Sequence, residues 1–195
     1  MTFAPDTNRT SRGGFSLVEI MIVLVLCSTL MALGMPRLDF ERYRVDAAVQ
    51  NLRTVLTQAQ RTALLRQYDV IISIDTAHGA LKWAEDANND GVIQSGEHTR
   101  SYPMADQIAF FSPPFGVDGV AAPKVAGSSL GTRNSLPTVT FHRDGAASSD
   151  LTLYVATPAH PNRSYRAIRL TQSTGRTDWY RSNQTAKVWV LGGLQ

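Results

Sequence analysis

Cysteine is nearly absent from this 195-residue chain, because Cys27 is its only one. A single thiol excludes an intrachain disulfide and any zinc site built from several cysteines. Glycine and proline, at 14 and 9 residues, are too few and too aperiodic for a collagen-like or linker protein. Charged residues make up only 18% and hydrophobic residues 43%, which excludes an intrinsically disordered chain. The chain therefore folds around a core, with a length typical of about one domain.

Enzyme signatures are also missing. There is no phosphate-binding loop, dinucleotide fingerprint or pair of catalytic carboxylates, and the four histidines are scattered without metal-ligand spacing. The segment Gly127-Ser128-Ser129-Leu130-Gly131 matches the G-x-S-x-G motif of hydrolases, which requires a strand before it and a helix after it. Here the motif lies in a Gly/Pro/Ser-rich stretch with no helix signal. We therefore expect no enzymatic activity.

The longest apolar run covers residues 15–35 and follows a polar stretch, residues 1–14, that contains Arg9 and Arg12. Its 21 residues would span about 30 Å as a helix, close to the thickness of a bilayer core. Basic residues before the run predict that the N-terminus stays in the cytoplasm while the rest of the chain is exported. The sequence thus predicts one membrane-spanning helix.

Glu19 is the only charged residue in this run. A carboxylate in hydrocarbon is unfavourable unless it is paired, and the run itself holds no cation. Cleavage between Gly14 and Phe15 would create one, the α-ammonium of Phe15, which could meet Glu19 of a neighbouring subunit in an assembly. The alternative is an ordinary single-pass anchor with a glutamate near its cytoplasmic end.

The segment Arg12-Gly13-Gly14-Phe15-Ser16-Leu17-Val18-Glu19-Ile20-Met21-Ile22 resembles the class III signal of type IV pilins and type II secretion pseudopilins. This resemblance implies that a prepilin peptidase cuts after Gly14 and methylates the new N-terminal Phe15. It also implies that Glu19 guides the alignment of subunits in a filament. Pro36 matches the proline that kinks the helix in that family.

The remaining pattern predicts an α+β fold of the pilin type. Apolar residues recur at three- and four-residue spacing from 45 to 66, which indicates an amphipathic helix. We expect one long helix, with residues 15–36 in the membrane or filament core and residues 37–67 packed on a head. The head, residues 68–195, alternates apolar and polar residues as antiparallel strands do, around a loop at 113–137. The predicted strands are 70–74, 80–84, 108–112, 138–142, 151–157, 165–171, 176–181 and 187–191.

Parts of the head are similar to GspH/FimT-type proteins, namely residues 59–64, 69–71 and 81–91 and the pair Gly175-Arg176. Major pilins carry a C-terminal disulfide loop, which a single cysteine forbids. The resemblance therefore implies a minor pilin or pseudopilin that helps initiate or cap a type IV pilus or a type II secretion pseudopilus. It implies anchoring in the bacterial inner membrane with the head in the periplasm. The implied partners are the prepilin peptidase, other pilins or pseudopilins and the assembly platform.

An acidic segment in the head matches the calcium-loop pattern D-x-[DN]-x-[DN]-G-x5-E, with Gly91 at the sharp turn. No cofactor is required by the rest of the chain, and Ca²⁺ is the one candidate. The alternative is a polar turn in which asparagine and glycine accommodate a left-handed backbone. The candidate ligands are Asp86, Asn88, Asp90, the Val92 carbonyl, Gln94 and Glu97.

Positive charge is concentrated at the C-terminal end. Residues 159–195 hold six basic residues against Asp178 alone, although the whole chain carries only +3. Arginines interleaved with Tyr165, Trp179, Tyr180 and Trp189 are typical of binding to nucleic acid without sequence preference. Some FimT-like minor pilins bind DNA in natural transformation, so DNA is the alternative partner. The other interpretation is a solvated sheet face with its aromatics in the core. The candidate DNA contacts are Arg163, Arg166, Arg169, Arg176, Arg181 and Lys187.

Overall fold

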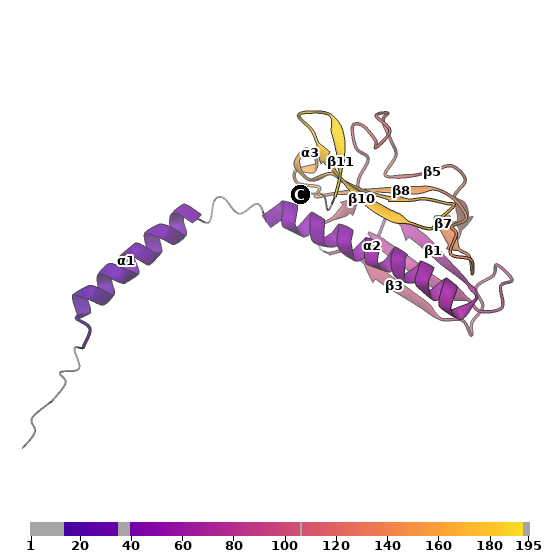
Figure 1. The fold of residues 1–195 in the computed structure, drawn as a ribbon, viewed down its shortest axis with the longest axis horizontal. Coiled ribbons are helices and arrows are strands. Elements are labelled where there is room, and N and C mark those ends of the chain that lie inside the picture. Colours follow the sequence, from indigo (N-terminus) through magenta and orange to yellow (C-terminus); the bar gives the residue numbers. More distant parts are fainter. Residues whose placement is uncertain (1–13, 35–39, 106, 193–195) are drawn as a thin grey trace, which may run out of the picture. The chain divides into compact units, whose positions relative to one another are not determined.

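The computed structural model describes residues 14–34, 40–105 and 107–192, and the side chains of residues 33, 34, 40, 162 and 163 are not described. The chain divides into two compact units, Met1–Asp39 and Phe40–Gln195. Each unit is considered separately below, and Figure 1 gives the element labels.

The first unit contains helix α1, Leu17–Gly34. Its described large apolar side chains are all exposed, from 48% for Ile20 to 75% for Leu17, and they surround the helix on every side. The hydroxyls of Ser28 and Thr29 donate to carbonyls of the same helix, at 2.7 and 2.9 Å, so these polar groups are satisfied internally.

Within the described part of the chain, no helix has both the length and the apolarity needed to cross a membrane. Pro36 lies outside the described residues, and so do the other residues of 35–39. A kink at Pro36 and a continuous helix over 15–67 therefore stay predictions.

The second unit begins with helix α2, Phe40–Arg66. The helix ends because Gln67 adopts a left-handed backbone, with φ of 58°, while its N–H donates to the Ala63 carbonyl at 3.0 Å. The Gln67 side chain also donates to the Leu64 carbonyl at 2.7 Å, which satisfies a second acceptor at the helix end.

Eleven described strands form two antiparallel sheets after α2. The first sheet has the order β3-β2-β1-β7-β6, and the second has the order β11-β10-β9-β8-β4 with β5 also paired to β8. A short helix, α3 (Pro161–Ser164), precedes β9. The first sheet contains β1 (Asp69–Asp75), β2 (Ala80–Asp86), β3 (Thr99–Pro103), β6 (Gly131–Arg133) and β7 (Leu136–Phe141). The second contains β4 (Ala109–Phe110), β5 (Val125–Gly127), β8 (Leu151–Ala156), β9 (Arg166–Leu170), β10 (Thr177–Asn183) and β11 (Val188–Leu191).

The α+β class, with a helix on antiparallel sheets, is confirmed, but two parts of the head differ from expectation. Strand β3 was not predicted, because its sequence TRSYP is polar, mostly exposed and lacks alternation. The expected loop 113–137 contains β5, β6 and the start of β7. These segments are strands because β8 and β7 offer them edges to pair with, which no local pattern reveals. The G-x-S-x-G segment joins β5 to β6, so no helix follows its serine.

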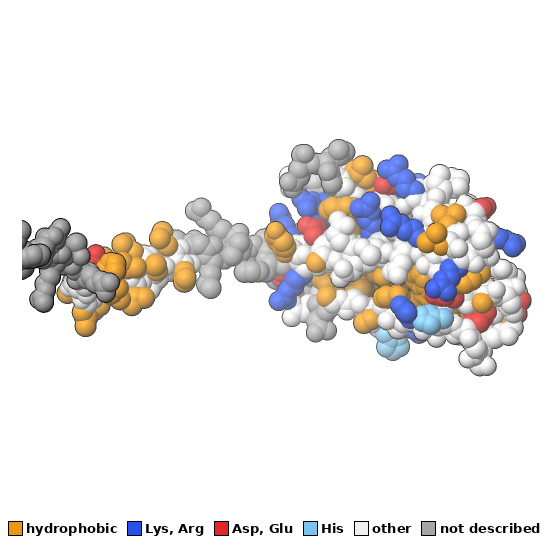
Figure 2. Space-filling view, turned by 60° about the horizontal axis from the view of Figure 1, so that its bottom comes forward, with side chains coloured by type: hydrophobic (Ala, Val, Ile, Leu, Met, Phe, Trp, Pro, Cys, Tyr) orange, Lys and Arg blue, Asp and Glu red, His pale blue; other side chains and the backbone are white. Residues whose placement is uncertain are grey.

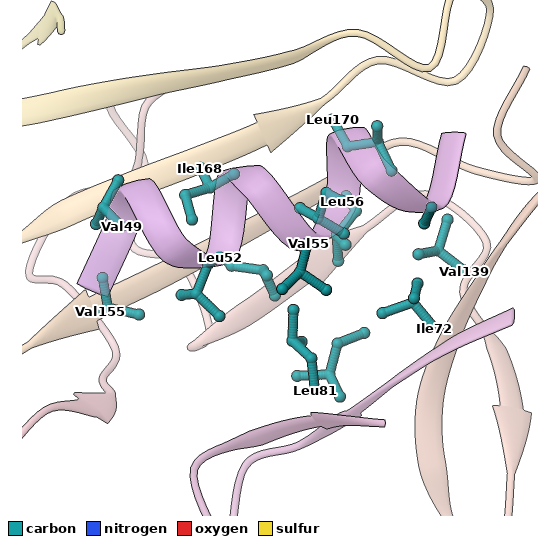
Figure 3. Close-up of a cluster of buried hydrophobic side chains, with 14 of the residues drawn as sticks. Val49, Leu52, Val55, Leu56, Ile72, Leu81, Val139, Val155, Ile168 and Leu170 are labelled. Atoms are coloured by element: carbon teal, nitrogen blue, oxygen red, sulfur yellow. The ribbon is translucent and has the colours of Figure 1, made fainter. Parts of the chain in front are cut away.

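The core lies between α2 and both sheets, as Figure 3 shows. Val49, Leu52 and Leu56 project from α2 and are at most 3% exposed. They meet residues of the first sheet and residues of the second, so one face of one helix holds the two sheets together. The labelled side chains of the sheets are Ile72, Leu81, Val139, Val155, Ile168 and Leu170.

Gln60, near the C-terminal end of α2, hydrogen-bonds to two turns of the head. Its amide nitrogen donates to the Gly145 carbonyl at 2.9 Å and to the Thr174 carbonyl at 2.7 Å. Gly175 has φ of +61°, and a Cβ there would lie 2.2 Å from the Gly145 oxygen. Only glycine fits this position, which explains the glycine of the Gly175-Arg176 pair in structural terms.

Replacing Leu56 by alanine should lower the free energy of unfolding by about 2–5 kcal/mol, since it leaves a cavity in a core that both sheets share. Leu65→Ala, the same change on the same helix at a side chain that is 84% exposed, is the matched control and should change it by less than about 0.5 kcal/mol. Denaturant unfolding of the full chain in detergent, followed by tryptophan fluorescence, measures both. Equal losses in the two variants would contradict the assigned core.

Candidate functional site

The predicted cleavage bond lies just before α1. Phe15 is 80% exposed, and a Cβ built on Gly14 would meet no atom within 4 Å, so the backbone around this bond is uncrowded. Glu19 lies in the first turn of α1, where a negative charge interacts favourably with the helix dipole. The bond between Gly14 and Phe15 is thus accessible, and the carboxylate lies one turn beyond it.

The acidic loop wraps around the carboxylate of Asp86 at the end of β2. This side chain is 1% exposed and accepts the N–H groups of Asp90 at 3.2 Å and Gly91 at 2.7 Å. Asn89 and Gly91 have φ of 56° and 75°, the left-handed conformations that let the chain turn back on itself.

The other two carboxylates of this loop also bind the loop itself. Asp90 accepts the Val92 N–H at 2.7 Å, and this bond is the main reason why its pKa is lowered. It also accepts the side-chain amides of Asn88 at 2.8 Å and Gln94 at 2.7 Å. Glu97 accepts the N–H groups of Ala87 at 3.0 Å and of Gln94 at 2.7 Å.

The six predicted calcium ligands therefore share one loop, but their carboxylates point at amide donors rather than at one another. Among the described residues, no three His, Cys, Asp or Glu side chains are grouped so that they could hold a metal ion. Arg133 of β6 also donates to the Gly91 carbonyl and places a positive charge beside the loop. The geometry is that of the polar turn, and calcium binding stays a prediction that requires these oxygens to exchange their partners.

Arg166 of β9 cannot contact a phosphate backbone in this structure, which corrects its place among the predicted DNA contacts. Only 1% of the residue is exposed. Its Nε donates to one oxygen of Asp46 at 2.5 Å, and its Nη1 donates to the Tyr165 carbonyl at 3.0 Å. Burial lowers the pKa of this guanidinium, and the bond to Asp46 works against that effect.

The other predicted DNA contacts do not share one surface. Arg181 lies opposite Arg166 in the β9–β10 pair and reaches the second oxygen of Asp46 at 3.1 Å. Arg169 lies opposite Asp178, three residues after Arg166 on the same strand, and this odd spacing turns its side chain to the other face of the sheet. It lies 3.5 Å from Asp118.

Of the two remaining described cations, Arg176 pairs with Asp178 at 2.9 Å and Lys187 is exposed, while the Arg163 side chain lies outside the described set. Figure 2 likewise shows blue side chains spread over this face of the head, with red ones among them. Tyr165 and Trp179 are buried at 3% and 8% exposure, so these aromatics belong to the core rather than to a stacking surface.

Each histidine lies beside one carboxylate on or near the surface, which agrees with their interpretation as turn or surface residues. For example, His142 lies 2.9 Å from Asp69, and His78 lies 3.0 Å from Asp75. Lys82 lies 2.8 Å from the same Asp75, and these contacts hold the pKa of Asp75 well below its usual range.

Asp46 is the residue that sequence reasoning missed. It follows Val45 on the buried face of α2 and neutralises arginines from two strands. Its partners lie 120 and 135 residues away, so no local spacing could have identified them. The only available signal was an acidic residue adjoining an apolar stripe.

Residues 9–35 match the family model of the prokaryotic N-terminal methylation motif. This range contains Gly14, Phe15 and Glu19, and it confirms the resemblance of the segment to prepilin signals. Comparison with the curated proteins gave no match.

Two solved structures are similar to the chain at low identity. The minor pseudopilin EpsH from the type 2 secretion system of Vibrio cholerae is 11% identical, with 77% of this chain and 99% of that chain covered and a TM-score of 0.48. The type IV minor pilin FimU of Pseudomonas aeruginosa is 15% identical, with 70% and 88% covered and a TM-score of 0.44. Such distant similarity assigns no role to any residue.

Calcium at the acidic loop can be tested by thermal unfolding of the full chain in detergent. An ion that binds only the folded state raises the melting temperature, so millimolar calcium should raise it and Asp90→Asn should abolish the rise. Asp144→Asn is the matched control, because Asp144 also accepts an N–H within a turn, that of Ala146 at 2.9 Å. An unchanged melting temperature up to about 10 mM calcium would leave only the polar turn.

Proposed function

We propose that the chain is a minor pilin or pseudopilin subunit, cut after Gly14 by a prepilin peptidase and methylated at Phe15. The subunit then joins a type IV pilus or a type II secretion pseudopilus and helps initiate or cap the filament. The observation that carries this proposal is the methylation motif over residues 9–35. The motif covers the apolar helix α1, and the second unit of the chain is a separate folded head.

The exposed apolar surface of α1 supports an assembled or membrane-bound state. Apolar surface left in water costs about 25 cal/mol for each Å², and α1 exposes large side chains along its whole described length. Lipid chains before assembly and neighbouring helices after it would both remove this surface from water. Arg9 and Arg12 precede the helix, so we propose anchoring in the inner membrane with the head in the periplasm.

Glu19 gives the assembly a means of setting register. Cleavage leaves an ammonium on Phe15, and an ammonium–carboxylate pair between subunits would satisfy both charges inside an apolar filament core. Because each charge is costly there without the other, subunits would align where the pair forms.

DNA binding during natural transformation is the alternative role. Arg176, whose side chain is 69% exposed, and Lys187 are accessible on the head and favour it. However, Arg166 is buried, and Arg169 and Arg181 lie on opposite faces of their sheet. The filament role therefore has the stronger support.

The processing step predicts a defined mature N-terminus. When the chain is produced in cells with an active prepilin peptidase, mass spectrometry should find a protein that starts at methylated Phe15. Cells lacking the peptidase provide the control and should retain residues 1–14. An intact leader in both strains would refute the proposal.

Glu19→Gln keeps the shape of the side chain and removes its charge, so the variant should be processed normally but enter filaments poorly. Glu41→Gln is the matched control, since Glu41 lies in the first turn of α2 and pairs with His160 at 3.0 Å on the head. Immunoblots of sheared filaments and of membranes measure incorporation and insertion separately. Normal incorporation of the Glu19 variant would exclude the proposed pairing while leaving the processing result intact.

A further inference from the structure

Strand β11 lies at one edge of the second sheet and, among the described residues, pairs on one side only, with β10. Its four residues are all apolar, and both of its valines, Val188 and Val190, are 48% exposed. The N–H and C=O groups of an open edge can pair with a strand of another chain. Proteins therefore protect their edges with charged residues, proline or short length. This strand has neither a charged residue nor a proline.

The other described edge strands carry such protection. Strand β3, at one end of the first sheet, contains Arg100 and Pro103 and is mostly exposed and polar. Strand β6, at the other end, has three residues, one of which is Arg133. Strands β4 and β5 have only two and three residues. Among the described edge strands, β11 is thus the longest that has neither a charge nor a proline.

The register of the β10–β11 ladder shows which backbone groups of β11 are open. Gly192 continues this register beyond Leu191, and its N–H donates to the Trp179 carbonyl at 2.8 Å. Opposed residues of an antiparallel pair alternate between those that exchange hydrogen bonds and those that do not. Counting back from Gly192, both valines bond to β10, whereas Trp189 and Leu191 turn their N–H and C=O groups outward. Among the described residues these four backbone groups have no hydrogen-bond partner.

We propose that β11 pairs in antiparallel fashion with β11 of a second copy of this chain, about a two-fold axis at Val190. In this register Trp189 lies opposite Leu191 of the second copy. The outward N–H and C=O groups of both residues then find partners in both copies. A two-fold axis at Trp189 or at Leu191 would place only one of these residues opposite an outward-facing residue of β11. The axis at Val190 is therefore the one that pairs every open group of the described strand.

The side chains agree with the same register. Val190 would meet Val190 of the second copy in a pair without hydrogen bonds, the closer kind of pair, with Cα atoms about 4.5 Å apart. Val188 of each copy would lie diagonally from Val190 of the other on the same face, so the exposed surface of all four valines would leave water. The pair therefore buries the apolar groups that the single chain leaves exposed.

The nearby positive charges do not oppose this contact. Arg181 lies opposite Val190 on β10, so the two copies of Arg181 would be three strand spacings, about 14 Å, apart. This separation exceeds the Debye length of about 10 Å at 0.1 M salt. Lys187 precedes β11, and its two copies would lie at opposite ends of the paired strands. Repulsion across the axis is thus screened.

The pairing has a limited strength and a closed geometry. A contact between two strands of four residues is small beside the interfaces of about 1,200–2,000 Å² that hold stable complexes together. The pair is therefore weak, and it forms where chains are concentrated. A two-fold contact closes on itself and does not extend into a filament. The inference concerns free chains, and it does not depend on the proposed filament role.

Disulfide trapping of the full chain in detergent tests the register. Cys27→Ser first removes the only natural thiol. In this background Val190→Cys places two thiols directly opposite each other at the axis, at a distance that a disulfide can bridge. Oxidation by oxygen with a copper catalyst should give a linked dimer on a non-reducing gel. Val188→Cys is the matched control, equal in exposure and face, but its two thiols would be about 14 Å apart and should link at least tenfold more slowly.

A second measurement tests association without a crosslink. Sedimentation of the full chain in density-matched detergent should show a dimer fraction that rises with protein concentration. Val190→Lys puts two like charges at the axis and should abolish this fraction, with an unchanged melting temperature because the side chain is half-exposed. Val120→Lys, at a valine that is 71% exposed outside the strands, is the control and should leave the dimer fraction unchanged.

The outcomes separate the proposed pair from other contacts. Fast linking of Val190→Cys together with loss of the dimer in Val190→Lys supports it. Equal linking rates for Val190→Cys and Val188→Cys would show random collision and overturn the register. A dimer that persists in Val190→Lys would place the contact elsewhere, for example along α1, and would overturn the proposal. Absence of both the linked and the sedimenting dimer would overturn it as well.

Discussion

The contact between the apolar face of α2 and both sheets is the constraint on which the rest of the head depends. Among the described residues the two sheets share no β-ladder, and α2 contacts strands of both. Ala59 and Ala63 are completely buried, and their small side chains let the helix approach the strands closely. Two polar residues of the same helix bond to the strands and turns around it, Asp46 near the start of the helix and Gln60 near its end. The helix therefore positions the Asp46 ion pairs at one end of the head and the turns bonded to Gln60 at the other.

Burial of Arg166 follows from this packing and determines what the basic strands can do. A guanidinium inside a protein is tolerated when it is paired, and Asp46 provides that pair together with a link to Arg181. As a result, the positive charge of residues 159–195 is partly internal. Alternation along β9 and β10 places Arg181 toward α2 and Arg169 on the other face. The charge that looks continuous in the sequence is thus divided in space between the ion pairs of Asp46 and separate ion pairs on the surface.

Helices and strands with a regular spacing of apolar residues could be predicted from the sequence. Strands and ion pairs that depend on residues far away in the chain could not. The apolar helix, the amphipathic helix and strands such as β1, β8 and β9 carry clear patterns, because each buries one face or lies wholly in the core. Strands β3, β5 and β6 are short and lack a clear alternating pattern, and they are strands because the edge of another strand lies beside them. At the candidate sites, the methylation motif was recognisable because its residues are contiguous. The partnership of Asp46 with Arg166 spans 120 residues, so no spacing rule could reveal it.

The two units differ in how many of their apolar and charged groups have partners within the same unit. The head buries its apolar residues and pairs most of its charges internally, with three buried polar side-chain atoms, one of them Arg166 Nη2, lacking a partner among the described residues. In α1 the apolar side chains are exposed, and Glu19 has no cation on its own helix. Cleavage after Gly14 would therefore change the chemistry of the segment that still needs partners, by adding a positive charge one turn from a negative one. Under the proposed function, processing changes only the anchor, because the head is a separate unit with a core of its own.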